Sequence, residues 1–361
     1  MEHIDIQTTA AIFTMPRAVQ HLPVAGGQAP TDLPATAWLL SDGRAGHEAQ
    51  ALGIVEALGV SADIRRVAPR ALYACLAPFG PIDPSEAPDR DGSPIAPPFP
   101  DLVIAAGRRT LPYLREIKRA SQGQTYTVYV NAPATGPGAA DLIVAPRHDS
   151  LFARNVVAPL TPANCVTPAR LQRLREAPDA RVAALPGPRV ALLIGGDSRH
   201  FKFTGADATA LTDIVHVLVA QGVSVMATAS RRTPDAVVRA VLEALEGTPG
   251  FLWDGAGDNP YFSMLANADA IIVTADSVNM VGEAAATGAP VHVFAPSGGH
   301  PKITAYLHGL EAAGAVRPWR SRLEDWRYEP INSTPMIADA IAQGYVASCA
   351  AARQSALRRG A

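Results

Sequence analysis

The feature that most constrains the fold is a recurring order of short apolar strand, glycine-bearing turn and helix. It begins with "AWLLS" at residues 37–41 and recurs at "DLVIAAG" (101–107), "RVALLIGG" (189–196) and "ADAIIVTADS" (268–277). Strands made almost entirely of Val, Ile, Leu and Ala are typical of parallel sheets that helices cover on both faces. The sequence therefore predicts an α/β fold with doubly wound parallel sheets.

The order of strands and helices starts afresh after Pro186-Gly187-Pro188, and this predicts two lobes in a chain of 361 residues. We expect a Rossmann-like lobe over residues 36–186 and a second over 187–330, with an interdomain cleft. Residues 1–35 show scattered Pro and Gly without a period, so we expect a loosely ordered extension. Residues 331–361 predict an amphipathic C-terminal helix that packs back across the lobes.

Composition excludes several classes of function. The 31 Lys and Arg against 33 Asp and Glu give a formal net charge of -2, which excludes a dominant nucleic-acid surface. The three cysteines have no paired spacing, so neither a disulfide framework nor a zinc site is expected, and no metal or cofactor is predicted. No run reaches about 18 apolar residues, so we expect no transmembrane segment and a cytoplasmic protein.

Polar strand-to-helix turns, which we call elbows, follow the strands of the second lobe. Open parallel sheets bind their ligands at such turns. Helix N-termini at these elbows offer free amides and partial positive charge, which suit phosphate groups. The candidate residues for a nucleotide ligand are Gly195, Gly196, Ser198, Ser230, Arg231, Ser277, Asn279 and Glu283. The structural alternatives are tight turns, helix caps, and a Glu283 side chain that faces solvent or an arginine.

The first lobe carries its own elbow, "DGRAGH" at residues 42–47, between a strand and a helix. An acid and a histidine here can move protons, which makes Asp42 and His47 candidate catalytic residues. Other residues at these strand ends are candidates for contact with an acceptor: Gly43, Arg44, Gly46, Arg108 and Asn131. The alternative is a helix capped by Asp42 beside an exposed histidine.

An ordered set of motifs resembles the mitochondrial-fission "elongated mitochondria" family. The set runs from "WLLSDGRAGHEAQALGIVEALG" through "LVIAAGRRTLPYL", "LLIGGDSRHFKF", "SRRTP" and "NPYFSMLANADAIIVTADSVNMVGEAAATGAPVHVF" to "GAVRPW", about residues 38–319. The family's plant namesake is a fission factor that recruits a dynamin-related protein. The family is in turn similar to GT-B glycosyltransferases, above all the peptidoglycan enzyme that adds N-acetylglucosamine to a lipid-linked acceptor.

This resemblance implies a GT-B-like arrangement with a nucleotide-sugar donor on the second lobe and an acceptor at the first. Carried over by position, Glu283 would hold the ribose, and Ser277 and Asn279 the diphosphate. Gly195, Gly196 and Ser198 would approach the phosphates, while Ser230 and Arg231 would lie near the base. Asp42 or His47 would be the base that activates the acceptor, and no metal is implied.

The chain departs from the family pattern in two places. Asn279 and Gly282 occupy positions where serine is usual, and "TPANCVTP" has Asn164 and Cys165 where the family has His and Arg. The second departure puts acceptor chemistry in question.

Three hypotheses follow. The first is a metal-independent GT-B-like glycosyltransferase that uses a nucleotide-diphosphate sugar. The alternatives are a non-enzymatic scaffold or adaptor of the fission-factor type, which includes peripheral membrane contact, and a UDP-sugar epimerase-like enzyme. The sequence leaves the sugar, the acceptor and the oligomeric state open.

Overall fold

The computed structural model describes residues 33–359, and the predicted extension at residues 1–35 lies almost entirely outside them. The described residues form two compact units. One comprises residues 33–165 together with 333–359, and the other comprises residues 166–332. We call them the first unit and the second unit.

The first unit is built on a six-stranded parallel sheet of order β2-β1-β3-β4-β5-β6. The central strands coincide with the predicted apolar runs, and β1 pairs on both sides, Leu39 opposite Ile64 and Ile104. The strands are β1 Ala37–Ser41, β2 Ala62–Arg66, β3 Leu102–Ala106, β4 Tyr126–Val130, β5 Leu142–Val144 and β6 Val156–Val157. The helices are α1 Ala45–Leu58, α2 Ala71–Leu76, α3 Leu111–Ala120 and α11 Thr334–Arg359.

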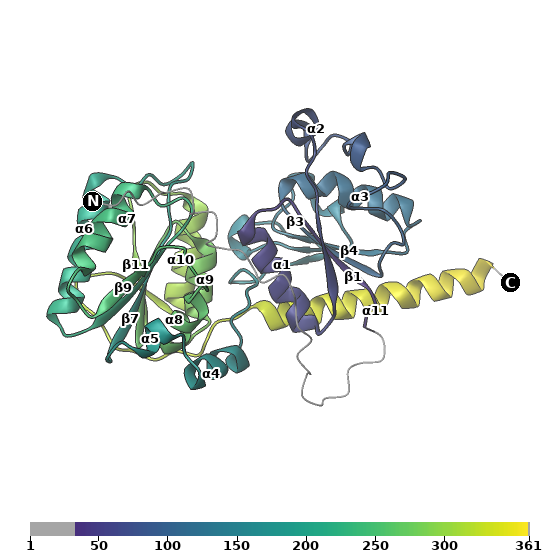
Figure 1. The fold of residues 1–361 in the computed structure, drawn as a ribbon. Helices are drawn as coiled ribbons and strands as arrows, with labels where there is room; N and C mark the ends of the chain where they lie inside the picture. The colour runs from purple at the N-terminus through teal and green to yellow at the C-terminus, as the bar shows by residue number, and fades with distance from the viewer. Residues whose placement is uncertain (1–32, 360–361) are drawn as a thin grey trace. The chain divides into compact units, whose positions relative to one another are not determined.

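Helices cover both faces of this sheet (Figure 1). On one face, Leu39 and Ile104 pack with Ile54 of α1 and with Ile337 and Ile341 of α11. On the other face, the cluster contains Leu40, Val103 and the α3 residues Leu111, Leu114 and Ile117. Alternate residues of each strand therefore serve opposite faces, as the pleat of a doubly covered sheet requires.

The second unit repeats this architecture with a parallel sheet of order β12-β11-β10-β7-β8-β9. Helices α6 and α7 lie on one face, and α8, α9 and α10 on the other (Figure 1). The strands are β7 Arg189–Ile194, β8 Ser224–Ala229, β9 Gly250–Trp253, β10 Ala270–Thr274, β11 Val291–Phe294 and β12 Val316–Pro318. The helices are α4 Pro168–Glu176, α5 Ala180–Ala183, α6 Gly205–Ala220, α7 Asp235–Leu245, α8 Tyr261–Asn267, α9 Val278–Ala285 and α10 Pro301–Ala312.

The two sheets confirm the predicted fold class of two doubly wound parallel sheets. The sequence did not predict edge strand β2, because "ADIRR" contains no apolar run. In the structure its residues are mostly exposed. An edge strand of this kind is fixed by pairing with β1 rather than by its own hydrophobicity.

The unit boundary also differs from the prediction at residue 186. Helices α4 and α5 pack with the second unit, where Arg175 Nε donates to the Ala266 carbonyl (2.9 Å) and the Asp179 amide to Ser263 Oγ (2.9 Å). The C-terminal helix α11 belongs to the first unit, because its apolar residues complete that unit's core.

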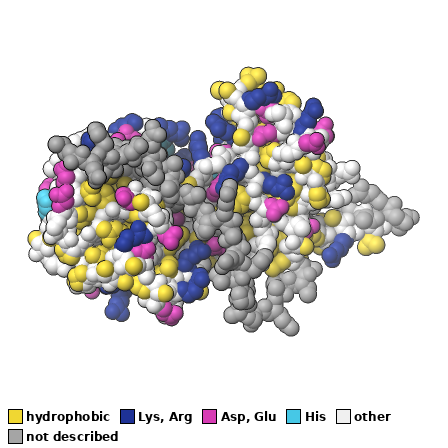
Figure 2. Space-filling view, viewed as in Figure 1, with side chains coloured by type: hydrophobic (Ala, Val, Ile, Leu, Met, Phe, Trp, Pro, Cys, Tyr) yellow, Lys and Arg dark blue, Asp and Glu magenta, His cyan; other side chains and the backbone are white. Residues whose placement is uncertain are grey.

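Charges of both signs are mixed on the face of the molecule that Figure 2 shows. Figure 2 shows Lys and Arg side chains interspersed with Asp and Glu on the face in view. Within residues 33–359, no helix is both long and apolar enough to cross a lipid bilayer.

Candidate functional site

The elbow after β1 places an acid beside a histidine. Asp42 follows the strand and His47 lies in the first turn of α1, with 2.9 Å between Asp42 Oδ1 and His47 Nδ1. The Asp42 side chain is 3% exposed and that of His47 is 24% exposed, so the pair is sheltered but the imidazole reaches solvent. The turn is tight: Gly43 has φ +79° and its amide donates to Ser41 Oγ (2.9 Å).

The electrostatics of this elbow favour an ionised Asp42. Burial acts to raise the pKa of the carboxyl group, but its hydrogen bond with His47 and the charges of His47 and Arg44 outweigh burial and lower the pKa. Arg44 Nε lies 3.8 Å from Asp42 Oδ2, and its side chain is largely exposed. A carboxylate that accepts from Nδ1 fixes the imidazole tautomer and leaves Nε2 as the basic nitrogen.

Gly107, which the sequence analysis did not select, makes room for this carboxylate. It follows β3 with φ +104°, and a Cβ there would lie 2.6 Å from Asp42 Cγ. Only glycine combines that backbone conformation with that close approach. The position of Gly107 after the strand was visible in the sequence, but its contact with Asp42 depends on β1 pairing with β3.

The other predicted acceptor-side residues lie around the same edge. Gly46 is in the first turn of α1. Asn131 follows β4 in a left-handed conformation (φ +85°), with its Nδ2 3.5 Å from Oε1 of the buried Gln50, one helical turn after His47. Arg108 is directed elsewhere: its guanidinium donates to the carbonyls of Ala74 (2.9 Å) and Ala77 and so holds the end of α2.

The departure at Asn164 and Cys165 falls in a buried structural segment. The backbone amide of Asn164 donates to Thr334 Oγ1 at the start of α11 (2.9 Å), and Cys165 Sγ lies 3.7 Å from the Ala49 carbonyl oxygen. A Cβ on Gly53 of α1 would lie 2.5 Å from the Asn164 carbonyl oxygen. In this chain the two residues therefore join α1 and α11 in one packed layer.

In the second unit, the glycine pair after β7 packs against the elbow of β10. The Gly195 amide donates to Thr274 Oγ1 (2.7 Å) and the Gly196 amide to Asp276 Oδ2 (2.8 Å). A Cβ on Gly195 would lie 2.2 Å from Asp276 Oδ2, and one on Gly196 would lie 2.1 Å from the Arg232 carbonyl carbon. Close approach is thus the reason for both glycines, but their amides have partners inside the protein.

Asp276 organises this edge of the sheet, although it was not among the predicted site residues. Its side chain is fully buried, it accepts from Thr274 Oγ1 (2.7 Å), and Arg232 lies 3.7 Å away. Burial raises the pKa of this carboxyl group despite the hydrogen bonds from Thr274 and Gly196 and the charge of Arg232. Its partners come from three elbows, so only the assembled sheet could reveal them.

The elbow after β8 exposes two arginines. Ser230 is tied to the turn, since Arg232 N donates to Ser230 Oγ (3.2 Å) and the Ser230 amide donates to Thr233 Oγ1 (2.8 Å). Arg231 is exposed, and Arg232 donates to the Asp197 carbonyl (3.0 Å). Ser198 caps the turn after β7, where its Oγ accepts from the amides of His200 (3.2 Å) and Phe201 (3.1 Å).

Helix α9 begins after Ser277, whose side chain makes no capping hydrogen bond. The first amides of a helix have no acceptor within the helix and point out of its N-terminus, where Ser277 and Asn279 are partly exposed. Glu283, deeper in α9, is buried, and the Tyr261 hydroxyl donates to its Oε2 (2.5 Å). Burial raises the pKa of Glu283 to about 7, against the hydrogen bond from Tyr261.

Apart from Arg108, the predicted residues therefore lie in two groups. One surrounds Asp42 and His47 at the carboxyl end of the first sheet, and the other surrounds the elbows of β7, β8 and β10 in the second. Glu283 faces neither solvent nor an arginine, since its partner is Tyr261. Among residues 33–359, no three His, Cys, Asp or Glu side chains gather as metal ligands would.

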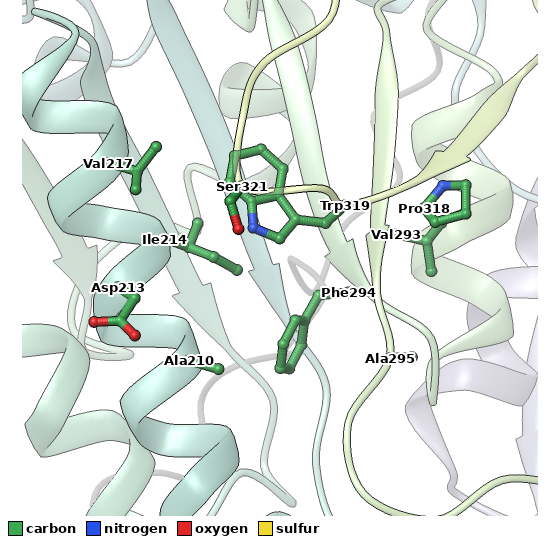
Figure 3. A pocket seen from close by; sticks show the side chains of 10 residues that line it. All are labelled: Ala210, Asp213, Ile214, Val217, Val293, Phe294, Ala295, Pro318, Trp319 and Ser321. Carbon is green, nitrogen blue, oxygen red and sulfur yellow. The ribbon is translucent and has the colours of Figure 1, made fainter.

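A pocket in the second unit lies apart from all of these residues. It has a volume of about 380 Å³ and opens between α6 and the ends of β11 and β12 (Figure 3). Its walls are mixed: Ile214, Val217, Phe294 and Trp319 are apolar, and Asp213 and Ser321 supply polar groups. None of the predicted site residues lines it.

Comparison with known proteins places this geometry in a family. Residues 45–345 match the sequence model of the family described as Mitochondrial fission ELM1. The Mitochondrial fission protein ELM1 of Arabidopsis thaliana is 33% identical over 271 residues, 67% of this chain and 63% of that protein. Uncharacterized protein RP120 of Rickettsia prowazekii is 30% identical over 164 residues, 42% of this chain and 45% of that protein. The matches thus span less than two thirds of either relative.

A solved structure shares the fold. UDP-GlcNAc 2-epimerase of Methanocaldococcus jannaschii superposes with a TM-score of 0.50 at 12% identity, over 84% of this chain and 98% of the epimerase. At this identity the likeness concerns the fold alone, which is GT-B-like. The family match covers most of the chain, and the chain belongs to the mitochondrial fission ELM1 family.

Proposed function

We propose that this chain is a metal-independent glycosyltransferase that takes a sugar from a nucleotide-diphosphate donor. The observation that carries the proposal is the Asp42–His47 pair: a sheltered carboxylate holds Nδ1 of a partly exposed imidazole at 2.9 Å. This is the arrangement of a general base with its orienting acid.

The chemistry assigns a role to each group. His47 Nε2 takes the proton of an acceptor hydroxyl, and Asp42 orients the ring and stabilises the imidazolium. The acceptor oxygen bonds to the anomeric carbon while the bond from that carbon to the phosphate oxygen breaks. The departing diphosphate carries the developing negative charge, and helix N-terminal amides and cations can stabilise that charge in place of a metal ion.

The second unit supports a nucleotide diphosphate as the donor. Its sheet presents the Ser277 helix start and the exposed Arg231 at one carboxyl edge, where parallel sheets bind ligands. A protein of the same fold acts on UDP-GlcNAc, as its name states. In this proposal Ser198, Ser230 and Asn279 surround the nucleotide. Gly195 and Gly196 shape the edge, and Glu283 takes the ribose after exchanging its Tyr261 partner.

Calorimetry against UDP-, GDP- and dTDP-sugars, with a chelator present, tests donor binding. We expect at least one ligand to bind with a sub-millimolar Kd. We also expect slow hydrolysis of the donor, in which water replaces the acceptor and the free nucleoside diphosphate is released. His47→Ala should leave donor binding unchanged and lower this release by about 10²–10⁴-fold, as the loss of a general base does. His216→Ala, at an exposed position on α6, is the control.

The outcomes separate the alternatives. No binding of any nucleotide sugar at millimolar concentration would contradict the proposal. Recovery of the donor with an inverted sugar centre and no released nucleotide would identify an epimerase instead.

A contact function is the second candidate, and one feature of the first unit favours it besides family membership. Helix α2 and the turn after it expose Leu72 (64%), Leu76 (46%) and Phe79 (71%). Large apolar side chains that gather on the surface are typical of interaction sites. Failure of every nucleotide sugar to bind would leave this contact function as the stronger candidate.

A further inference from the structure

Two histidines of the second unit form an imidazole pair outside the groups described above, with their ring planes tilted by 46°. His200 lies in the loop after β7 and His300 is the N-cap residue of α10, with 4.0 Å between the ring centroids. Arg199 Nε donates to His200 Nε2 (2.9 Å). The sequence places these residues 100 positions apart, so only the tertiary structure brings the rings together.

The backbone holds the pair in place. Phe201 and Gly298 form an antiparallel bridge, the Lys202 amide donates to the Ser297 carbonyl (3.0 Å), and the Gly299 amide donates to the His200 carbonyl (2.8 Å). A Cβ on Gly298 would lie 2.3 Å from the His200 carbonyl oxygen. Backbone hydrogen bonds therefore join the loop after β7 to the loop after β11 and fix the positions of the two imidazoles.

Arg199 is the positively charged side chain in contact with the imidazole pair, through its hydrogen bond to His200. The nearby carboxylates are engaged: Asp197 binds Lys202 Nζ (3.1 Å) and the Phe203 amide, while Asp207 accepts from Thr204 and from the Ser297 amide (3.0 Å). Burial, with the charges of His300 and Arg199, lowers the pKa of His200. An anion at this position would relieve the repulsion between these groups.

The imidazole pair also lies at the carboxyl edge of the second sheet, where the proposed donor binds. Strands β7 and β11 lie on either side of β10 in the sheet. Strand β10 leads into Ser277 and α9. The crossed loops that carry His200 and His300 therefore belong to the same carboxyl edge as the α9 N-terminus.

We infer that His200, His300 and Arg199 bind a phosphate group and that His200 takes up a proton from solvent when the phosphate arrives. The inference rests on the proposed function for the source of that phosphate, which is the diphosphate of the donor. The guanidinium and the imidazole N–H groups donate to phosphate oxygens, and the added negative charge stabilises an imidazolium that the neighbouring cations otherwise disfavour.

Calorimetry with inorganic pyrophosphate, and separately with UDP, tests this inference. Each titration is run at pH 7.5 in two buffers of different ionisation enthalpy, PIPES and Tris, without phosphate. The difference in apparent enthalpy gives the number of protons taken up. We expect a clear fraction of one proton in the parent protein. His200→Gln should abolish most of the uptake, and His300→Gln should weaken binding about tenfold.

Two further variants keep the test independent of folding defects. Arg199→Ala alters an exposed side chain and should also weaken pyrophosphate binding about tenfold. His308→Gln, at an exposed position on the same helix as His300, should bind and take up protons as the parent does.

Absence of pyrophosphate binding at millimolar concentration, binding without proton uptake, or an unchanged His300→Gln titration would each overturn the inference. Its failure is distinguishable from failure of the proposed function. Pyrophosphate binding with proton uptake but no nucleotide-sugar binding would retain the phosphate site and reject the transferase. Nucleotide-sugar binding that ignores His300 and Arg199 would do the reverse.

Discussion

Two buried carboxyl groups show how neighbours decide the state of an acid. Asp42 has His47 and Arg44 beside it, and its pKa is lowered although burial alone would raise it. Glu283 accepts a hydrogen bond from the Tyr261 hydroxyl, but burial dominates and its pKa rises to about 7. The sequence located both acids, but the sign of each pKa change depends on partners that come from other elements or from the geometry of a turn.

Glu283→Gln tests the second case. Between about pH 4.5 and 7 the folded protein holds a proton on Glu283 that the unfolded chain releases, so the free energy of unfolding falls as pH rises through this window. A difference from 4.5 to about 7 corresponds to about 3 kcal/mol, lost in full above pH 7. Glutamine keeps an acceptor for Tyr261 without this penalty.

We therefore expect Glu283→Gln to unfold in urea at about the same midpoint as the parent at pH 5 and at a higher midpoint at pH 8. Glu243→Gln, at an exposed position on α7, is the matched control and should follow the parent at both values. A Glu283→Gln protein with the parent's pH dependence would show that Glu283 does not carry this proton.

At the scale of elements, the turns from strand to helix carry most of the polar chemistry, and their glycines serve two distinct purposes. Gly43 and Gly107 both have positive φ, but only a side chain at Gly107 would meet another group, the Asp42 carboxylate. Gly195 and Gly196 permit close approach between elbows. The local sequence signals a turn in every case, whereas the purpose of each glycine depends on which strand lies next to it.

Gly107→Ala should therefore cost more than backbone strain. We expect a loss of about 1 kcal/mol from the positive φ and a further 1–2 kcal/mol from displacing Asp42. Gly123→Ala is the control, because Gly123 has φ +80° and open space around a Cβ. Only Gly107→Ala should change the ¹⁵N shifts of the His47 ring, which report its hydrogen bond with Asp42. Equal destabilisation and equal His47 spectra in both variants would contradict the contact.

At the scale of the whole molecule, the last helix in the sequence belongs to the first unit. Helix α11 follows the entire second unit, yet Ile337 and Ile341 lie fully inside the first unit's core. Hydrogen bonds join its start to the segment that ends the first unit, between Thr161 and Ser333 (3.0 Å) and between Asn164 and Thr334 (2.9 Å). The first unit is therefore discontinuous in sequence.

Truncation after Asn332 tests this arrangement. Loss of Ile337, Ala338 and Ile341 removes several kcal/mol of apolar burial, which is comparable to the stability of a domain. We expect amide exchange to become fast in β1, β3 and β4 while β7, β8 and β10 stay protected. Truncation after Ala350 removes the last part of α11, where residues 351–355, 357 and 358 are exposed, and should leave both sheets protected. Protection of β1 without α11 would contradict the role of this helix.

The sequence alone determined the local features of this protein: apolar parallel strands, helices between them, and polar elbows at the strands' carboxyl ends. These features follow from periodicity and from the conformational preferences of Gly, Pro and β-branched residues, which act over a few positions. Only the tertiary structure decided the partners. It paired Gly196 with Asp276, Glu283 with Tyr261, Arg108 with the end of α2, and His200 with His300. Such contacts depend on strand order, and strand order brings together residues that the chain separates by tens of positions.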